Sequence, residues 1–356
     1  MRNPVVISLI SLLFFTKITV QGAAQGTPRK NLIIDTDLFS DVDDASALLL
    51  AATSPLVNLL AVNVNHPSLY SSLTASAILA HYGHPTIPIG AIRPLTNATF
   101  IDTWLYRLGE YTSKIAYHFS GGSLPWGRAD EAWDPVDVYR KTLAESEDVT
   151  IVSIGFLDNL SALLNSTGDR WSDLTGRELV SKKVKELVVM GGGYPTGHSY
   201  NFWGSNGSLS AHVINTWEGR ITFVGDDVGK HVLSGAPLMK DAPETDPVRM
   251  AYIYYTYYRA HSSWDPLAVM YAIHGAGGLF RFGNEYGYNH VEQNGSNRWV
   301  WDEDARNQHF LRLKVDNETA AAELDRLFLE GALPVVEKRG GTATCEGKES
   351  CPREEL

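Results

Sequence analysis

The stretch NLIIDTDLFSDVDDASALLLA, residues 31–51, places five aspartates within ten residues and encloses them between two apolar runs. They are Asp35, Asp37, Asp41, Asp43 and Asp44. Carboxylates this close together repel one another unless a positive charge lies among them. Oxygen ligands from several carboxylates suit a hard cation such as calcium or magnesium. The first apolar run is typical of a buried strand and the second of a helix, so the stretch predicts a metal site where strand and helix meet.

Three other interpretations account for these aspartates less well. A solvated acidic turn with one aspartate capping the helix explains one carboxylate, but not five between two buried elements. A calcium-binding EF-hand loop needs a glycine and a closing glutamate, whereas Phe39, Ser40 and apolar residues stand at its later positions. A haloacid-dehalogenase-type phosphatase would use Asp35 as nucleophile and Asp37 as acid and base. It would leave the other three aspartates without a role, and it expects a hydroxyl residue where Phe39 stands.

The rest of the chain alternates strand-like and helix-like segments. Short apolar runs typical of buried strands occur at residues 31–36, 57–64, 84–90, 149–154, 186–190 and 220–224. Helical patterns occur at residues 43–52, 69–82, 135–144, 208–217, 247–261 and 264–273. This order predicts an α/β fold with an open, mostly parallel sheet and helices on both faces. Residues 92–134 and 280–310 lack the alternation, and we expect an insertion or lid in the first and a hairpin-like excursion in the second.

Polar motifs follow four of the predicted strands directly. They are the aspartate cluster, the group Asn63, Asn65 and His66, the segment 154–159, and the glycine-rich segment 190–194. Ligands of open α/β sheets bind at the carboxyl ends of the strands. The four motifs therefore predict one site at that edge of the sheet.

The bulk composition excludes some partners. The chain has 356 residues and a formal net charge of −11, and it contains no basic run, which argues against nucleic acid as a partner. Residues 1–24 carry an early arginine, an apolar core and small residues near Ala24, which predicts a signal peptide and a secreted, extracellular protein. A membrane anchor is the alternative, but the apolar core is shorter than the roughly 20 residues that span a bilayer. We therefore expect no membrane attachment of the mature form.

In a secreted protein, sequons can be glycosylated and cysteines can form disulfides. Sequons begin at Asn97, Asn159, Asn165, Asn206, Asn294 and Asn317. The two cysteines, Cys345 and Cys351, lie in a polar tail, residues 336–356, which we expect to be disordered. In an oxidising compartment they could close a small loop. They are too few to predict a metal site.

Five motifs of the chain resemble, in order, those of the inosine-uridine-preferring nucleoside hydrolases. They are Asp35-Thr-Asp37 with Asp43-Asp44-Ala45, the turn 153–159, Met190-Gly-Gly-Gly193, Tyr200-Asn201-Phe202 and Trp264-Asp265-Pro266-Leu267-Ala268. The resemblance covers about residues 31–335. It implies one catalytic domain with the nucleoside hydrolase fold, whose core is Rossmann-like, and it allows a homo-oligomer, because relatives form dimers or tetramers.

The resemblance also implies an activity, a cofactor and a set of site residues. The family's members are calcium-dependent hydrolases that cleave the N-glycosidic bond of ribonucleosides. The implied calcium ligands are the side chains of Asp37, Asp44 and Asp265 and the backbone carbonyl of Ile154. The implied catalytic base is Asp37, which takes a proton from the attacking water while the sugar develops oxocarbenium character. Asp43 and Asn201 are implied to hold the ribose.

Three further residues have expected roles that follow from their positions in or beside these motifs. Asn65 lies where the family has a ribose-contacting asparagine after the second strand, so we expect it to bind substrate. Asp35 is expected to support the site from behind the ligands. Asn159 stands inside a motif of the core, which argues against its glycosylation.

The chain departs from the family pattern at Ser199 and Trp264. Ser199 replaces a glutamate that helps to hold the ribose, so a charged anchor is lost although a hydroxyl remains to contact substrate. Trp264 replaces a histidine that protonates the departing base in some members, and its N–H cannot act as an acid near neutral pH. It could instead stack on the base or fill the core. We expect the acid among His198, His66 and tyrosines of the insertion, and the wall of the base pocket among Trp104, Tyr106, Trp126 and Trp133, although each of these residues is equally explained by packing.

The departures leave two hypotheses open. The first is a secreted, calcium-dependent ribonucleoside hydrolase. The second is a protein that keeps the fold and the metal but binds a nucleoside-like ligand or a partner without efficient hydrolysis. Release of ribose from nucleosides distinguishes them.

Overall fold

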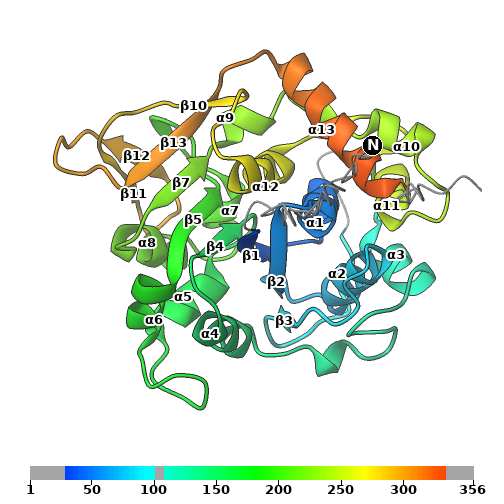
Figure 1. Ribbon diagram of the computed structural model, residues 1–356, viewed down its shortest axis with the longest axis horizontal. Helices are drawn as coiled ribbons and strands as arrows, with labels where there is room; N and C mark the ends of the chain where they lie inside the picture. The colour runs from blue at the N-terminus through cyan, green and yellow to red at the C-terminus, as the bar shows by residue number, and fades with distance from the viewer. Residues whose placement is uncertain (1–28, 101–107, 334–356) are drawn as a thin grey trace, which may run out of the picture.

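The computed structural model describes residues 29–100 and 108–333, and its centre is a mostly parallel sheet, as predicted (Figure 1). Eight strands lie in the order β10-β13-β7-β5-β4-β1-β2-β3. Their bounds are β1 Lys30–Thr36, β2 Val57–Val64, β3 Ile89–Ala91, β4 Val149–Ser153, β5 Val184–Met190, β7 Ile221–Val224, β10 Phe280–Phe282 and β13 Gln308–Leu313. All pair in parallel except β10, which runs antiparallel to β13 at one edge.

Strand β1 lies inside the sheet because its alternating side chains are apolar on both faces. Leu32 and Ile34 belong to one buried core and Ile33 to the other. The first core packs under α1 Asp43–Thr53, α2 Leu69–His81, α10 Ala236–Asp241, α11 Pro247–Thr256, α12 Trp264–His274 and α13 Asn317–Ala332. The second packs under α4 Pro135–Glu145, α5 Asp158–Asn165, α6 Gly176–Lys183 and α8 Gly207–Thr216. In Figure 1 these two sets of helices lie on opposite faces of the sheet.

The strand order reverses at β1, and this reversal positions the site. From β1 the chain continues outward to β2 and β3, and then returns to β4 on the other side of β1. The loops after β1 and β4 therefore diverge and leave a crevice at the carboxyl ends of the two strands. The aspartate cluster follows β1, and Ile154 follows β4 directly.

The remaining elements are short. They are α3 Thr112–His118, η1 Ala129–Glu131, β6 Thr196–Gly197, α7 Tyr200–Trp203, α9 Asp226–Gly229, β8 Leu233–Ser234, β9 His261–Ser262, β11 Tyr288–Val291 and β12 Asn297–Val300. The hairpin expected within residues 280–310 is β11–β12, and β12 also pairs with β6. The predictions did not contain the helices α5, α6, α10 and α13 or the sheet strands β10 and β13.

One predicted helix, over residues 247–261, ends earlier than expected. Helix α11 stops at Thr256, because Tyr257 and Tyr258 adopt left-handed backbone conformations with φ of 51° and 65°. The chain then turns, and His261 enters strand β9. This early end changes the candidate site, as shown below.

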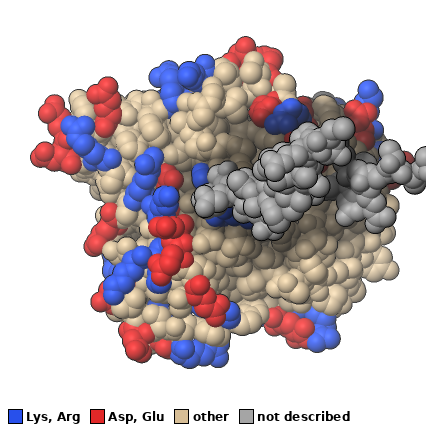
Figure 2. All heavy atoms as spheres, viewed as in Figure 1, with Lys and Arg blue, Asp and Glu red and all other residues tan. Residues whose placement is uncertain are grey.

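Several predictions lie outside the described residues. They are the signal peptide 1–24, the tail 336–356 with Cys345 and Cys351, and the aromatics Trp104 and Tyr106. Within the described ranges no helix is both long and apolar enough to cross a membrane. On the face in Figure 2, basic and acidic side chains lie interspersed.

Candidate active site

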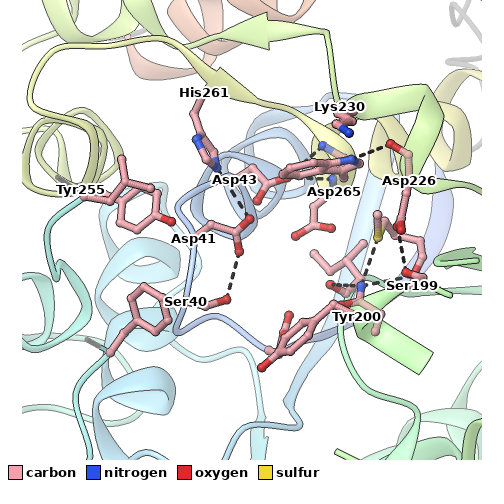
Figure 3. Close-up of a pocket in the computed structure, with 17 residues that line it drawn as sticks. Ser40, Asp41, Asp43, Ser199, Tyr200, Asp226, Lys230, Tyr255, His261 and Asp265 are labelled. Atoms are coloured by element: carbon pink, nitrogen blue, oxygen red, sulfur yellow. Dashed lines mark hydrogen bonds and ion pairs between the residues drawn. The ribbon is translucent and has the colours of Figure 1, made fainter. Parts of the chain in front are cut away.

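A cavity of about 610 Å³ opens at the carboxyl ends of the strands (Figure 3). It is lined by side chains that follow β1, β5 and β7, by the first turn of α12 and by Ile154, which directly follows β4. The site residues predicted from the sequence that line it are Asp37, Asp43, Ile154, Ser199, Asn201, Trp264 and Asp265. Its volume lies within the range of small-molecule sites.

Buried carboxylates form the floor of the cavity. Oxygens of Asp43, Asp44 and Asp265 lie within 4.8 Å of one another. Burial, followed by the charges of Asp41 and Asp43, raises the pKa of Asp37 well above its ordinary value. Burial and the neighbouring carboxylates likewise raise the pKa values of Asp44 and Asp265. The protein thus gathers several carboxyl groups here more closely than their charges tolerate unless a cation lies among them.

Asp44 provides a direct test of whether these residues fit a metal ion. Its Oδ1 accepts a hydrogen bond from the Thr36 hydroxyl, whereas its Oδ2 is buried and finds no hydrogen-bond partner in the described part of the chain. A buried carboxylate oxygen without a partner is costly, and a bound cation would satisfy it. Because the surrounding donors are oxygens, the residues fit a hard divalent cation.

The turn after β4 brings a backbone carbonyl beside these carboxylates. Ile154 N donates to the Asp35 carbonyl at 2.7 Å, which extends the pairing of β4 with β1. The Ile154 carbonyl accepts from Asn201 Nδ2 at 3.4 Å, and the same amide donates to Met190 O at 3.2 Å. Gly155 permits this approach, because a Cβ there would lie 2.4 Å from Asp37 N. The structure therefore brings Asp37, Ile154 and Asn201 together, as the sequence predicted.

Asp43 has a structural contact that the sequence did not reveal. Its Oδ2 accepts the backbone N–H groups of Trp264 at 2.9 Å and of Asp265 at 3.1 Å. Ser263, the N-cap residue of α12, makes no capping bond with its own side chain. Asp43 therefore caps α12 from a distant part of the sequence and fixes Asp265 beside the other carboxylates. Burial, then the charge of Asp41, raises the pKa of Asp43 to about 7.

Asp35 lies behind the cavity at the centre of a buried network. Its carboxylate accepts hydrogen bonds from Asn65 at 2.6 Å, Tyr139 at 2.5 Å and Asn159 at 3.2 Å. Burial raises the pKa of Asp35 to about 7, although these bonds lower it. Asn159 is 2% exposed, in agreement with the argument against its glycosylation.

The expectation that Asn65 contacts substrate needs correction. Asn65 is buried and is not among the residues that line the cavity. Its Nδ2 donates to Asp35, and its Oδ1 accepts from Phe156 N at 3.1 Å. Both ends of the amide are thus engaged by the protein, and the residue links the turn after β4 to Asp35.

A carboxylate stands beside Ser199, where the sequence predicted that a charged anchor is lost. Ser199 Oγ donates to Asp226 Oδ1 at 2.8 Å, and Asp226 lines the cavity. Trp264 Nε1 donates to the Asp226 backbone carbonyl at 2.8 Å, so the indole is fixed at the same wall. Burial raises the pKa of Asp226. Sequence reasoning missed Asp226, although it follows a predicted strand as the other motifs do.

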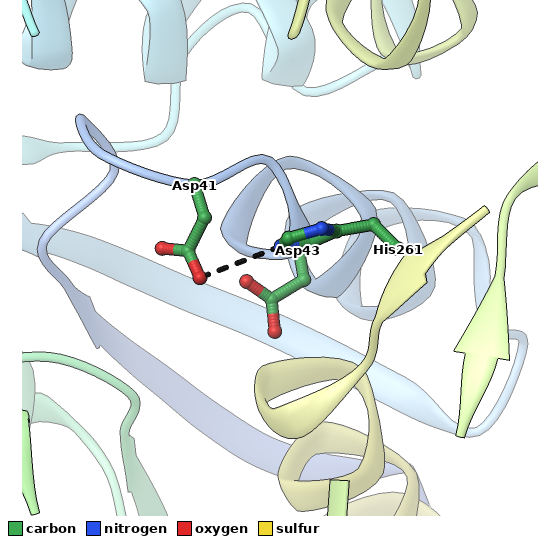
Figure 4. A group of neighbouring side chains, drawn as sticks. All are labelled: Asp41, Asp43 and His261. Atoms are coloured by element: carbon green, nitrogen blue, oxygen red, sulfur yellow. Dashed lines mark ion pairs between the residues drawn. The ribbon is translucent and has the colours of Figure 1, made fainter. Parts of the chain in front are cut away.

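His261 is the second cavity residue that sequence reasoning missed. Its Nε2 lies 3.6 Å from Asp41 Oδ2, and oxygens of Asp41 and Asp43 lie within 4.8 Å of it (Figure 4). Asp41 also accepts from Ser40 Oγ at 3.0 Å, and its carbonyl accepts from the Tyr111 hydroxyl at 2.9 Å. Asp41, for which the sequence offered no role, therefore holds an imidazole at the cavity.

The histidines expected as acids lie elsewhere. His66 stacks on Phe39 at a ring distance of 3.7 Å, and burial lowers its pKa to about 4. His198 faces Asn294 O at 3.1 Å and stacks near Trp203. Neither ring is among the cavity-lining residues.

The aromatic wall of the cavity also differs from the expectation. Trp126 packs with Tyr70, and Trp133 packs with Trp171, both away from the cavity. Phe100, Leu108, Tyr200, Tyr255 and Trp264 supply the apolar lining instead. Phe100 and Leu108 belong to the segment that the sequence identified as an insertion.

The chain is similar to several known proteins. The family described as inosine-uridine preferring nucleoside hydrolase matches residues 32–326. The inosine-uridine preferring nucleoside hydrolase of Crithidia fasciculata is 28% identical over 266 residues, which cover 68% of this chain and 79% of that protein. The pyrimidine-specific ribonucleoside hydrolase RihA of Salmonella schwarzengrund is 30% identical over 174 residues, 47% of this chain and 50% of that one. A solved plant nucleoside hydrolase, PpNRh1, has the same fold, with a TM-score of 0.62 at 19% identity over 85% of this chain and 99% of that one.

Proposed function

The chain belongs to the inosine-uridine preferring nucleoside hydrolase family, and from this premise we propose that it is a secreted, calcium-dependent enzyme that hydrolyses ribonucleosides to free base and ribose. The observation that carries the proposal is a group of buried carboxylates at and just behind the cavity wall, in which oxygens of Asp43, Asp44 and Asp265 lie within 4.8 Å of one another and the charge of Asp37 acts on both Asp44 and Asp265. One oxygen of Asp44 has no hydrogen-bond partner in the described part of the chain. Secretion rests on the sequence of residues 1–24 alone.

Calcium would be held by the side chains of Asp37, Asp44 and Asp265 and by the carbonyl of Ile154. When bound, it supplies a positive charge that acidifies water and orients the 2′- and 3′-hydroxyls of the ribose. The all-oxygen donor set supports calcium over softer metals.

Asp37 is the proposed general base. Its carboxylate lines the cavity at the end of β1, where Gly155 packs against it and limits its movement. As the C1′–N bond lengthens and the sugar becomes oxocarbenium-like, Asp37 takes a proton from the water that adds to C1′. The other carboxylates of the floor stabilise the developing positive charge electrostatically.

The ribose is held at the end of the cavity that contains Asn201, Ser199 and Asp226. Asn201 is oriented by the carbonyls of Ile154 and Met190, so its side chain is preorganised for a hydroxyl. Asp226, supported by Ser199, offers a charged acceptor for another hydroxyl of the sugar. We assign to Asp226 the anchoring role for which Ser199 alone is too weak.

The base occupies the aromatic part of the cavity. Phe100, Tyr255 and Trp264 offer faces and edges suited to a flat heterocycle. The concentration of carboxylates disfavours phosphorylated substrates and supports uncharged nucleosides, and the net charge of −11 argues against nucleic acid.

The test is a panel of inosine, uridine, adenosine and guanosine, with free ribose as the readout. We expect ribose from at least one of them. The matched control is Asp44→Asn, which removes a proposed calcium ligand and should abolish the signal. A protein that binds a nucleoside in calorimetry but releases no ribose from any of the four would support the binding-protein alternative and overturn the proposed activity.

A further inference from the structure

The proposed reaction requires a proton for the departing base, and Trp264 cannot provide one. We infer that His261 donates this proton, with Asp41 as the residue that positions it. The inference rests on the proposed hydrolase function and adds to it a catalytic residue that lies outside the family-like motifs of the chain.

His261 is the one histidine among the residues that line the cavity in the described part of the chain. Its side chain is 16% exposed, so the ring is largely enclosed but still reaches the cavity. Edge-to-face contacts with Tyr255 at 5.3 Å and with Trp264 at 6.1 Å fix the orientation of the ring. A rigid donor of this kind meets the positional requirement of general acid catalysis.

The location of the ring agrees with the end of the cavity assigned to the base. In Figure 3, His261, Asp41 and Tyr255 lie on one side of the cavity, and Ser199, Asp226 and Lys230 lie on the other. Ser199 and Asp226 belong to the proposed sugar end. A group that leaves from C1′ toward the aromatic side therefore moves toward His261.

The surroundings favour the protonated imidazole. Burial alone lowers the pKa of His261, but the Asp41 carboxylate 3.6 Å away, together with the charge of Asp43, outweighs burial and raises it. Of the other charged groups that line the cavity, Asp265 belongs to α12, whereas Lys230, which follows α9, lies on the opposite side (Figure 3); Tyr255 faces the ring from α11. The other oxygen of Asp41, Oδ1, accepts a hydrogen bond from Ser40 Oγ, which holds the carboxylate in place.

The proton balance is complete without a further reactant. The C1′–N bond breaks, and its electron pair goes to the base nitrogen. A ring nitrogen of His261 gives its proton to the base, while water adds to C1′ and gives a proton to Asp37. His261 then regains a proton from solvent and Asp37 loses one, so the net reaction is nucleoside plus water to ribose plus neutral base.

Two substrates separate acid catalysis from a merely structural role. A nucleoside such as inosine or uridine needs a proton on its leaving group. 4-Nitrophenyl β-D-ribofuranoside releases a stable phenolate, which leaves without one. For His261→Asn and His261→Gln we expect kcat on nucleosides to fall roughly 100-fold or more, and kcat on the nitrophenyl riboside to change by less than about 3-fold.

Asp41→Asn should lower kcat in the same substrate-dependent way, roughly 10-fold on nucleosides. His198→Asn is the matched control and should leave both substrates unchanged, because its ring lies away from the cavity. Retained cleavage of the nitrophenyl riboside also shows that each variant is folded.

Equal losses of activity on both substrates, or unchanged nucleoside activity in the His261 variants, would overturn the inference. These results differ from failure of the proposed function, in which the unaltered protein releases ribose from neither substrate. That result would overturn both proposals together.

Discussion

The carboxylate of Asp43 accepts the backbone N–H of Trp264 at 2.9 Å, although 221 residues separate the two in the chain. The bond joins the acidic stretch after β1 to the start of α12. It holds Asp265, the next residue, within reach of Asp44. The proposed metal-binding group is therefore assembled by a helix cap.

The cap predicts a difference between two substitutions of Asp43. Asp43→Asn keeps an oxygen that can accept the two N–H groups, whereas Asp43→Ala removes it. Both remove the same negative charge, so the comparison isolates the cap. We expect Asp43→Ala to be less stable than Asp43→Asn by about 1 kcal/mol in denaturant unfolding. Equal stability of the two variants would show that the cap contributes nothing.

Calcium should stabilise the protein more as pH rises. Burial raises the pKa values of Asp35 and Asp43 from 3.8 to about 7. The metal-free folded state thus binds protons more tightly than the unfolded state, and it loses stability as pH rises from about 4 to above 7. Deprotonated carboxylates are also the form that binds a cation.

Thermal unfolding with and without a chelator, at pH 5 and pH 8, checks this prediction. The gain in Tm from calcium should be larger at pH 8 by roughly 3 °C or more. A gain in Tm from calcium that is the same at both pH values, or larger at pH 5, would be inconsistent with titration of these buried carboxyl groups.

The Asp226 carboxylate should contribute to substrate binding. Asp226→Asn keeps an acceptor for Ser199 but removes the charge, and we expect KM for nucleosides to rise roughly 10- to 100-fold with a smaller change in kcat. The neighbouring Asp227→Asn is the control, because Asp227 pairs with Arg312 and does not line the cavity. If steady-state kinetics gave the same KM for both variants, Asp226 would not be an anchor.

Gly155 should not tolerate a side chain. An added Cβ would lie 2.4 Å from Asp37 N and 2.8 Å from Asp37 Cβ, so Gly155→Ala must displace the proposed base. We expect a loss of about 1–3 kcal/mol of stability from overpacking and a fall in kcat of roughly 10- to 100-fold.

Gly278→Ala is the matched control for Gly155→Ala. A Cβ at Gly278 meets no atom within 4 Å, so stability and kcat should be unchanged. Full activity of Gly155→Ala would show that the position of Asp37 is not limited by this turn.

The sequence predicted the sheet and most of the cavity floor for one physical reason. In a parallel sheet all strands end at the same edge, so polar residues that directly follow apolar runs converge. This holds for Asp37 and for the backbone carbonyl of Ile154, and it would have held for Asp226 had the same rule been applied after the strand at residues 220–224. Asn201 lies farther on, in α7 beyond β6, and only the family resemblance pointed to it.

The other features of the site depend on tertiary contacts, which local sequence patterns do not reveal. The aromatic run before His261 continues a helical pattern, and only the left-handed conformations of Tyr257 and Tyr258 end the helix and turn His261 into the cavity. The direction of the Asn65 side chain is set by Asp35 and by Phe156 N, the latter far along the chain.

The most direct test of the central claim is ribose release measured on one preparation before chelation, after exhaustive chelation and after return of calcium, with metal content determined at each stage. We expect activity to be lost with the metal and restored by calcium at about one ion per chain. Undiminished ribose release from protein shown to be free of metal would contradict a calcium-dependent hydrolase built on Asp37, Asp44 and Asp265.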